Sequence, residues 1–108
     1  MEAVPEVTPP PAFCSIQAKF DFLEKVHKPA YAAAIRNNDA ARGYLATLNQ
    51  LAQDYDSHST PAAVLACDRF RTFEPKAREA YDLAGVLLQL DQKIRDAPLE
   101  HCSGGKAG

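Results

Sequence analysis

Apolar residues recur every three or four positions along most of this chain, which is the spacing of amphipathic α-helices. The first stripe predicts a helix over about residues 15–37, the second a helix over about 39–55, and the third a helix over about 61–96. The third stripe consists of Ala63, Ala66, Cys67, Phe70, Phe73, Ala77, Ala80, Tyr81, Ala84, Leu87, Leu88 and Ile94. No segment alternates in the way that a half-buried strand requires. The pattern therefore predicts an all-α protein.

Turn and cap residues separate the three stripes. Asn37 and Asn38 suit a turn, and Asp39 can accept hydrogen bonds from the first amides of a following helix. Farther along, the Ser-Thr-Pro segment at 59–61 provides an N-cap followed by a proline at a position where its missing amide is harmless. We therefore expect chain reversals near residue 38 and near residue 58.

Pro29 and Pro75 interrupt the first and third stripes, and a proline inside a helix kinks or breaks it. Both stripes keep their phase across the proline, which favours a kink over a full turn. The prediction is an antiparallel bundle of three long proline-kinked helices. If a proline marks a turn instead, the bundle has four shorter helices.

The two ends of the chain differ in composition from its body. Residues 1–13 contain four prolines, which lack an amide donor and favour extended geometry, so we predict a disordered Pro-rich arm. Residues 99–108 end in Ser-Gly-Gly-Lys-Ala-Gly and predict a flexible tail. The helical bundle is expected to span residues 14–98.

Composition and charge narrow the class of protein. With 108 residues, 46% hydrophobic and 24% charged, the chain is expected to form one globular domain. A formal charge of -2 gives no reason to expect a nucleic acid or an acidic membrane as partner. The sequence contains neither an apolar run long enough to span a bilayer nor an intact signal peptide, so an exported form is expected to have lost its signal.

Three cysteines, Cys14, Cys67 and Cys102, allow one disulfide and leave one thiol. Their placement favours an oxidising compartment, which predicts a periplasmic or secreted protein of bacterial type. A four-helix bundle brings the chain ends together and predicts Cys14–Cys102. A three-helix bundle places Cys14 near Cys67, and the preserved stripe phase slightly favours this pairing. The alternatives are a buried, unpaired Cys67 and three reduced cysteines in a cytosolic protein.

Candidate catalytic and metal-binding chemistry is weak. The chain lacks the nucleophile elbow, the zinc-protease helix motif and the glycine-rich phosphate loops. Cys67 and His27 are isolated, and a core cysteine with a surface histidine explains them better than a nucleophile and a base. Asp54, Asp56 and His58 alternate as metal ligands could, but a surface turn has the same composition. We expect a non-enzymatic protein without metal or cofactor.

Basic residues between 67 and 78 alternate with aromatic ones, as in some nucleic-acid-binding proteins. On a helix, however, Arg69 and Lys76 share one face, whereas Arg71 and Arg78 lie on nearly the opposite face. The charges are therefore divided around the helix, and acidic neighbours dilute them further. This distribution is typical of a solvated helix surface and predicts no nucleic-acid binding.

Five apolar residues lie beside the main stripes and could either widen the core or form a surface for a partner or a second copy. They are Phe22, Val26, Val64, Leu65 and Val86. Our leading hypothesis is an exported, non-enzymatic helical protein of accessory, adaptor, inhibitor or antigen type that binds another protein, with a homodimer as one form of that binding. The second is a small intracellular α-helical regulator or enzyme accessory with reduced cysteines. The third is a metal- or redox-active protein that uses one of its cysteines.

Overall fold

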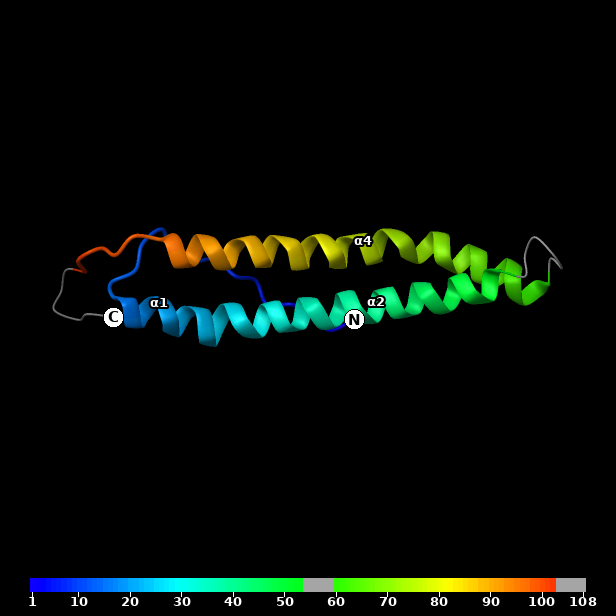
Figure 1. The fold of residues 1–108 in the computed structure, drawn as a ribbon, viewed down its shortest axis with the longest axis horizontal. Helices are drawn as coiled ribbons and strands as arrows, with labels where there is room; N and C mark the ends of the chain where they lie inside the picture. Colours follow the sequence, from blue (N-terminus) through cyan, green and yellow to red (C-terminus); the bar gives the residue numbers. More distant parts are fainter. Residues whose placement is uncertain (54–59, 103–108) are drawn as a thin grey trace.

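The computed structural model describes residues 1–53 and 60–102 and shows an antiparallel hairpin of two long helical segments (Figure 1). The first segment consists of α1 (Ile16–Phe22), the π-helical η1 (Leu23–His27) and α2 (Lys28–Ala52), which follow one another without interruption. The second segment is α4 (Pro61–Asp96). The molecule measures 72 × 18 × 15 Å, so it is a rod two helices thick. The all-α prediction is confirmed for the described residues, but the predicted bundle of three or four helices is wrong.

The predicted turn at residues 37–39 does not form, because α2 continues through it. Asn37 is buried, and its amide pairs with the backbone of the N-terminal arm. Its Nδ2 donates to the carbonyl oxygen of Glu2 at 2.8 Å, and its Oδ1 accepts from the amide of Glu2 at 3.0 Å. An asparagine favours turns when its side chain bonds to nearby backbone, and here a backbone segment distant in sequence takes both bonds.

Neither proline ends its helix, as the phase of the stripes predicted. Pro29 is the second residue of α2, one residue beyond the end of η1. The amide of Lys28 donates to the carbonyl oxygen of Leu23, five residues earlier. A proline ring collides with the carbonyl group four residues earlier in a regular α-helix, and here that residue, Lys25, lies in the wider π-helical turn η1. Pro75 lies inside α4, which continues to Asp96.

The predicted start of the last helix is confirmed in detail. Thr60 has extended backbone geometry, and its Oγ1 accepts a hydrogen bond of 3.1 Å from the amide of Ala63. Pro61 is the first residue of α4, where its missing amide needs no partner.

Alanine dominates the seam between the two helical segments. Nine of the fourteen buried apolar residues in the described part of the chain are alanines, which remove little apolar surface from water compared with leucine or phenylalanine. On α4 the seam residues are spaced alternately by three and four, as in a coiled coil. They are Ala63, Ala66, Phe70, Phe73, Ala77, Ala80, Ala84, Leu87, Asp91 and Ile94. Such a thin core makes contacts outside the seam important for stability.

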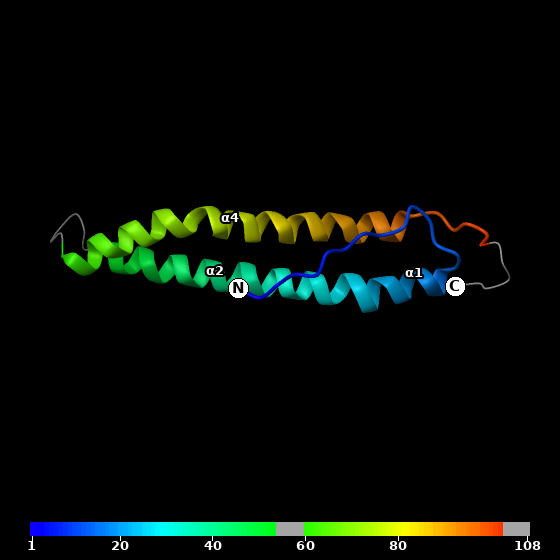
Figure 2. The same cartoon turned by 180° about the vertical axis from the view of Figure 1, so that it is seen from behind.

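The N-terminal arm supplies one of these contacts, so the prediction that it is disordered is wrong. Figure 2 shows the arm running in front of α2 and α4. Val4 and Val7 are partly buried against the cluster formed by Ala30, Ala34, Ala84 and Leu87. The arm thus adds apolar burial that the two-helix seam lacks.

Phe13 joins the arm to the C-terminal end of the chain. Its side chain is buried in a cluster with Leu23 and Ile94. Its amide donates to the carbonyl oxygen of Pro98 at 3.0 Å, and its carbonyl oxygen accepts from the amide of Glu100 at 2.8 Å. The first residues of the predicted flexible tail are therefore paired with the arm, while residues 103–108 lie outside the described residues.

A disulfide closes the same end of the hairpin. Cys14 and Cys102 are bonded, with their Cα atoms 5.4 Å apart, and Cys67 is a partly exposed free thiol. The preference for Cys14–Cys67 rested on three helices and is wrong. An even number of helical segments returns the chain to its starting end, and two segments do this as well as four.

We expect the double substitution Cys14→Ser, Cys102→Ser to lower the free energy of unfolding by about 2–4 kcal/mol, because the bond closes a long loop in the unfolded chain. Urea unfolding at one protein concentration measures this loss. Cys67→Ser is the control and should change stability by less than about 1 kcal/mol. Equal effects of the two changes would contradict the stabilising role of the disulfide.

Candidate functional site

The hairpin has two long faces, one on each side of the alanine seam, and they differ in what covers them. The arm lies across one of them, in front of the helices in Figure 2 and behind them in Figure 1. We call this the arm face, because Pro9, Pro10 and Pro11 of the arm line a hollow there with Leu90 and Ile94 of α4. The opposite side, the open face, has hollows whose lining includes no arm residue.

Three hollows follow one another along the open face. The largest has a volume of about 560 Å³ and lies near the middle of the hairpin. Tyr31, Ile35 and Asn38 of α2 and Tyr81, Gly85 and Leu88 of α4 are among its lining residues. A second of about 370 Å³ shares Tyr31 and Leu88 with it and extends toward the disulfide. A third of about 170 Å³, beside Cys67 and Ala52, lies toward the other end.

Large apolar side chains project around the central hollow. Tyr81 is 66% exposed and Leu88 is 58% exposed, although both were assigned to the core stripe from the sequence. Gly85 lies between them, and a Cβ atom added there would meet nothing within 4 Å. The absence of a side chain at Gly85 therefore deepens the hollow beside the projecting Tyr81 ring.

Asn38 leaves a polar atom without a partner at the same hollow. Its Oδ1 is buried and accepts no hydrogen bond. A buried acceptor that has lost its water without gaining a partner costs free energy, typically about 1–3 kcal/mol. Asn37, the neighbouring residue on the arm side, has both of its amide groups bonded to Glu2. The arm thus satisfies the asparagine on its own face, and nothing described satisfies Asn38.

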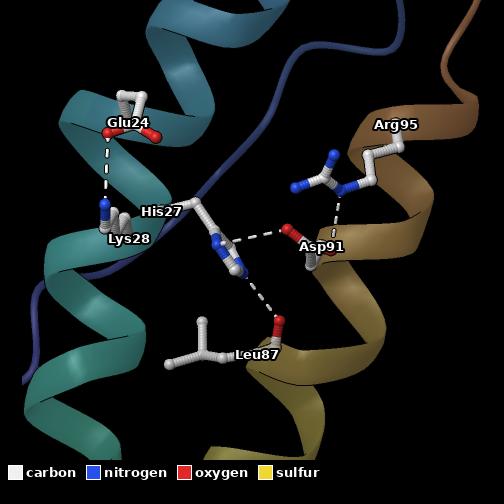
Figure 3. A network of polar contacts seen from close by, with 6 residues as sticks. All are labelled: Glu24, His27, Lys28, Leu87, Asp91 and Arg95. Carbon is white, nitrogen blue, oxygen red and sulfur yellow. Dashed lines mark hydrogen bonds and ion pairs between the residues drawn. The ribbon is translucent and has the colours of Figure 1, made fainter.

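His27 lies at the floor of the second hollow, where it joins the two helical segments (Figure 3). It is 4% exposed, and its Nε2 lies 2.7 Å from the carbonyl oxygen of Leu87. Because a carbonyl oxygen only accepts, Nε2 carries the proton and donates. Nδ1 lies 3.9 Å from Asp91 Oδ1, which is beyond hydrogen-bond distance, and Asp91 Oδ2 accepts instead from Arg95 Nε at 2.9 Å.

The expectation of a surface histidine and a core cysteine is wrong, because His27 is buried and Cys67 is partly exposed. The contacts of His27 make it a structural residue. Its ring also stacks on Tyr31, with the ring centroids 6.0 Å apart, so it supports the wall of the central hollow. The nucleophile and base considered from the sequence do not meet: His27 faces Leu87, and Cys67 lies twenty residues earlier on α4, about 30 Å along the helix.

Within residues 1–53 and 60–102, no three His, Cys, Asp or Glu side chains are close enough to hold a metal ion. The considered ligands Asp54, Asp56 and His58 lie outside the described residues. In the described part of the chain, no helix combines the length and apolarity needed to cross a membrane.

The five residues predicted as a partner surface are dispersed over the rod. Val26, Val64, Leu65 and Val86 are exposed, and of these only Val86 borders the central hollow. Phe22 is partly buried and packs edge-to-face on Phe13, with the ring centroids 5.7 Å apart. The residues that line the open face were missed because its α4 side was counted as core. The seven-residue spacing of Tyr81 and Leu88, one position after seam residues, is the signal that places them beside the seam.

Comparison with protein-family models, with curated proteins and with solved structures finds no match for this chain.

We expect His27→Ala to lower the free energy of unfolding by about 1–3 kcal/mol, because it removes a buried ring and its bond across the helices. His101→Ala changes an exposed histidine and should shift stability by less than about 0.5 kcal/mol. Urea unfolding compares the two variants. A His27→Ala protein as stable as the control would contradict the structural role of His27.

Docking of the arm should depend on pH through Glu2. Arg36 donates two hydrogen bonds to the Glu2 carboxylate, at 2.7 and 2.8 Å, and this pairing lowers the pKa of Glu2 from its ordinary value of 4.5. A lowered carboxyl pKa contributes stability that is complete above the ordinary value and is lost as the pH falls through the lowered value. We therefore expect the arm end to detach below pH 4.5.

The NMR signals of the Val4 and Val7 methyl groups, followed from pH 7 to acid, measure this detachment. Glu2→Gln is the control, because glutamine carries no titratable charge. In this variant the methyl signals should lose the acid transition that titration of Glu2 causes. An unchanged acid transition in the Glu2→Gln protein would show that another group controls the arm.

Proposed function

We propose that the protein is an exported, non-enzymatic association module that binds another polypeptide through its open face. The observation that carries this proposal is the difference between the two faces. The arm covers part of one face and satisfies its Asn37, while the other keeps Tyr81 and Leu88 exposed around an open hollow and leaves Asn38 unsatisfied. Exposed apolar surface with a hollow at its centre is typical of a protein-binding site.

The shape of the open face favours a helical ligand. Tyr81 and Leu88 lie two turns apart on α4, about 10 Å along its axis, and the hollows lie in line with the helices. An amphipathic helix presents apolar side chains at the same spacing and can lay them into such a crevice. Among the described residues, His27 is the titratable side chain buried at this face, and its ring bonds to Leu87, which supports binding over catalysis as the role of the site.

The disulfide supports the exported location within this proposal. Cys14–Cys102 closes the end of the hairpin beside the buried Phe13, and such bonds persist mainly in oxidising compartments. A periplasmic or secreted location is the setting in which this bond would persist.

A photo-cross-linking amino acid placed at Leu88 tests the use of the open face in the cells that produce the protein. The matched control places the same group at Leu83, which is 39% exposed and lies seven residues before the arm-face residue Leu90. We expect defined polypeptide adducts from position 88 and none of the same mass from position 83. Absence of adducts at 88, or identical adducts at both positions, would contradict the proposal.

A further inference from the structure

We infer that the polypeptide on the open face is a second copy of this chain, so that two hairpins pack face to face as a twofold-symmetric four-helix dimer. This inference rests on the proposed use of the open face and specifies its partner. It is carried by self-complementary features on that face, by their position along the hairpin and by the area available.

The first feature is a projection and a hollow one helical turn apart. Tyr81 projects from α4 with 66% of its surface exposed, and Gly85, four residues later, opens the hollow. A twofold axis that crosses α4 between these residues places Tyr81 of each copy at the hollow beside Gly85 of the other. Symmetric dimers require this reciprocity, in which each copy offers both halves of one contact.

The same axis crosses α2 at the level of Ile35. Ile35 lines the hollow together with Tyr81 and Gly85, so it lies at the same level along the hairpin. An axis at that level sets Ile35 against Ile35 of the second copy. Tyr31 and Asn38 lie four residues before and three residues after Ile35, so Tyr31 of one copy is level with Asn38 of the other. Tyr31 of one copy then lies beside Asn38 of the other, and both residues line the hollow.

The area of this arrangement is that of a specific dimer. An antiparallel overlap centred between Tyr81 and Gly85 covers residues 70–96 of α4, which is about 40 Å of helix. The hairpin is 18 Å across in the plane that contains both helices (Figure 1). The two dimensions give roughly 700 Å² per copy, near the 800 Å² of a standard interface. Burial on this scale also compensates for the small area that the alanine seam provides.

The charges of the open face predict how the dimer responds to salt. The symmetric overlap sets Arg42 level with Lys28 of the second copy, and both side chains are exposed. Lys28 keeps its own partner, Glu24, at 3.5 Å, which limits the repulsion. Since apolar contact drives the association and like charges oppose it, screening by salt should tighten the dimer.

Sedimentation velocity on the full, disulfide-bonded chain from about 1 to 200 μM tests this inference. We expect a concentration-dependent species of twice the 11.8 kDa chain mass that grows at higher salt. Tyr81→Lys and Gly85→Leu should each weaken the dimer by about tenfold or more, one by placing a charge at the interface and the other by filling the hollow.

Matched controls separate the interface from effects on folding. Gly43→Leu also replaces a helical glycine whose added Cβ would meet nothing within 4 Å, and Leu65→Lys also places a charge at an exposed apolar site. Both controls should dimerise like the natural chain. Gly85→Leu should also raise monomer helicity, because glycine is a poor helix former, so its loss of dimer cannot result from unfolding.

Two results overturn the inference: a natural chain that stays monomeric throughout the range, and a dimer that Tyr81→Lys and Gly85→Leu leave intact. If the chain is monomeric and the cross-linker at Leu88 captures a different protein, the inference fails and the proposed function stands. If the chain is monomeric and position 88 gives no adduct, both fail.

Discussion

The pairing of α2 and α4 along an alanine-rich seam is the constraint on which the rest of this structure depends. Alanine lets the helices pair along their full length, but each residue removes little apolar surface from water. Large apolar side chains such as Tyr81 and Leu88 lie beside the seam, where the two helices leave them exposed. The arm covers this apolar surface on one face of the rod, and the surface on the other face stays uncovered.

On one face the chain supplies the cover. The arm places Val4 and Val7 against the seam cluster, and Phe13 enters the core at the disulfide end of the hairpin. Glu2 fixes the N-terminal end of the arm through its bonds with Arg36 and Asn37. The Cys14–Cys102 bond joins the point where the arm meets α1 to the C-terminal end of the described chain. On the opposite face the corresponding surface stays exposed around Tyr81, Gly85 and Leu88, and it provides the structural basis for proposing association as the function.

The sequence predicts the local structure of this protein well and its long-range structure less well. Helical content, continuity through Pro29 and Pro75 and the cap at Thr60 depend on neighbouring residues, and all are confirmed. The turn at Asn37 and Asn38 was wrong because the Asn37 side chain bonds to a segment 35 residues away. The extra turn gave three helices instead of two helical segments. Three helices predict the Cys14–Cys67 pair, whereas the structure has Cys14–Cys102.

The candidate site was not predicted either, because it also depends on long-range structure. Apolar periodicity marks a stripe but does not tell which of its members face the seam and which lie beside it, so Tyr81 and Leu88 were assigned to the core. Their place on the open face depends on there being two helical segments instead of three. A third segment would have covered the hollow beside Gly85, and only the number of helices shows that it is open.

In the proposed dimer, the open face joins two copies about an axis near residue 83 of α4. Cys67 is the free thiol of the described chain and lies just beyond the proposed overlap, so a spin label attached there reports the arrangement without occupying it. The dimer predicts a distance of about 50 Å between the two labels, because sixteen residues of helix separate each label from the axis. Absence of a dipolar signal at concentrations where the protein sediments as a dimer, or a distance near 20 Å, would contradict it.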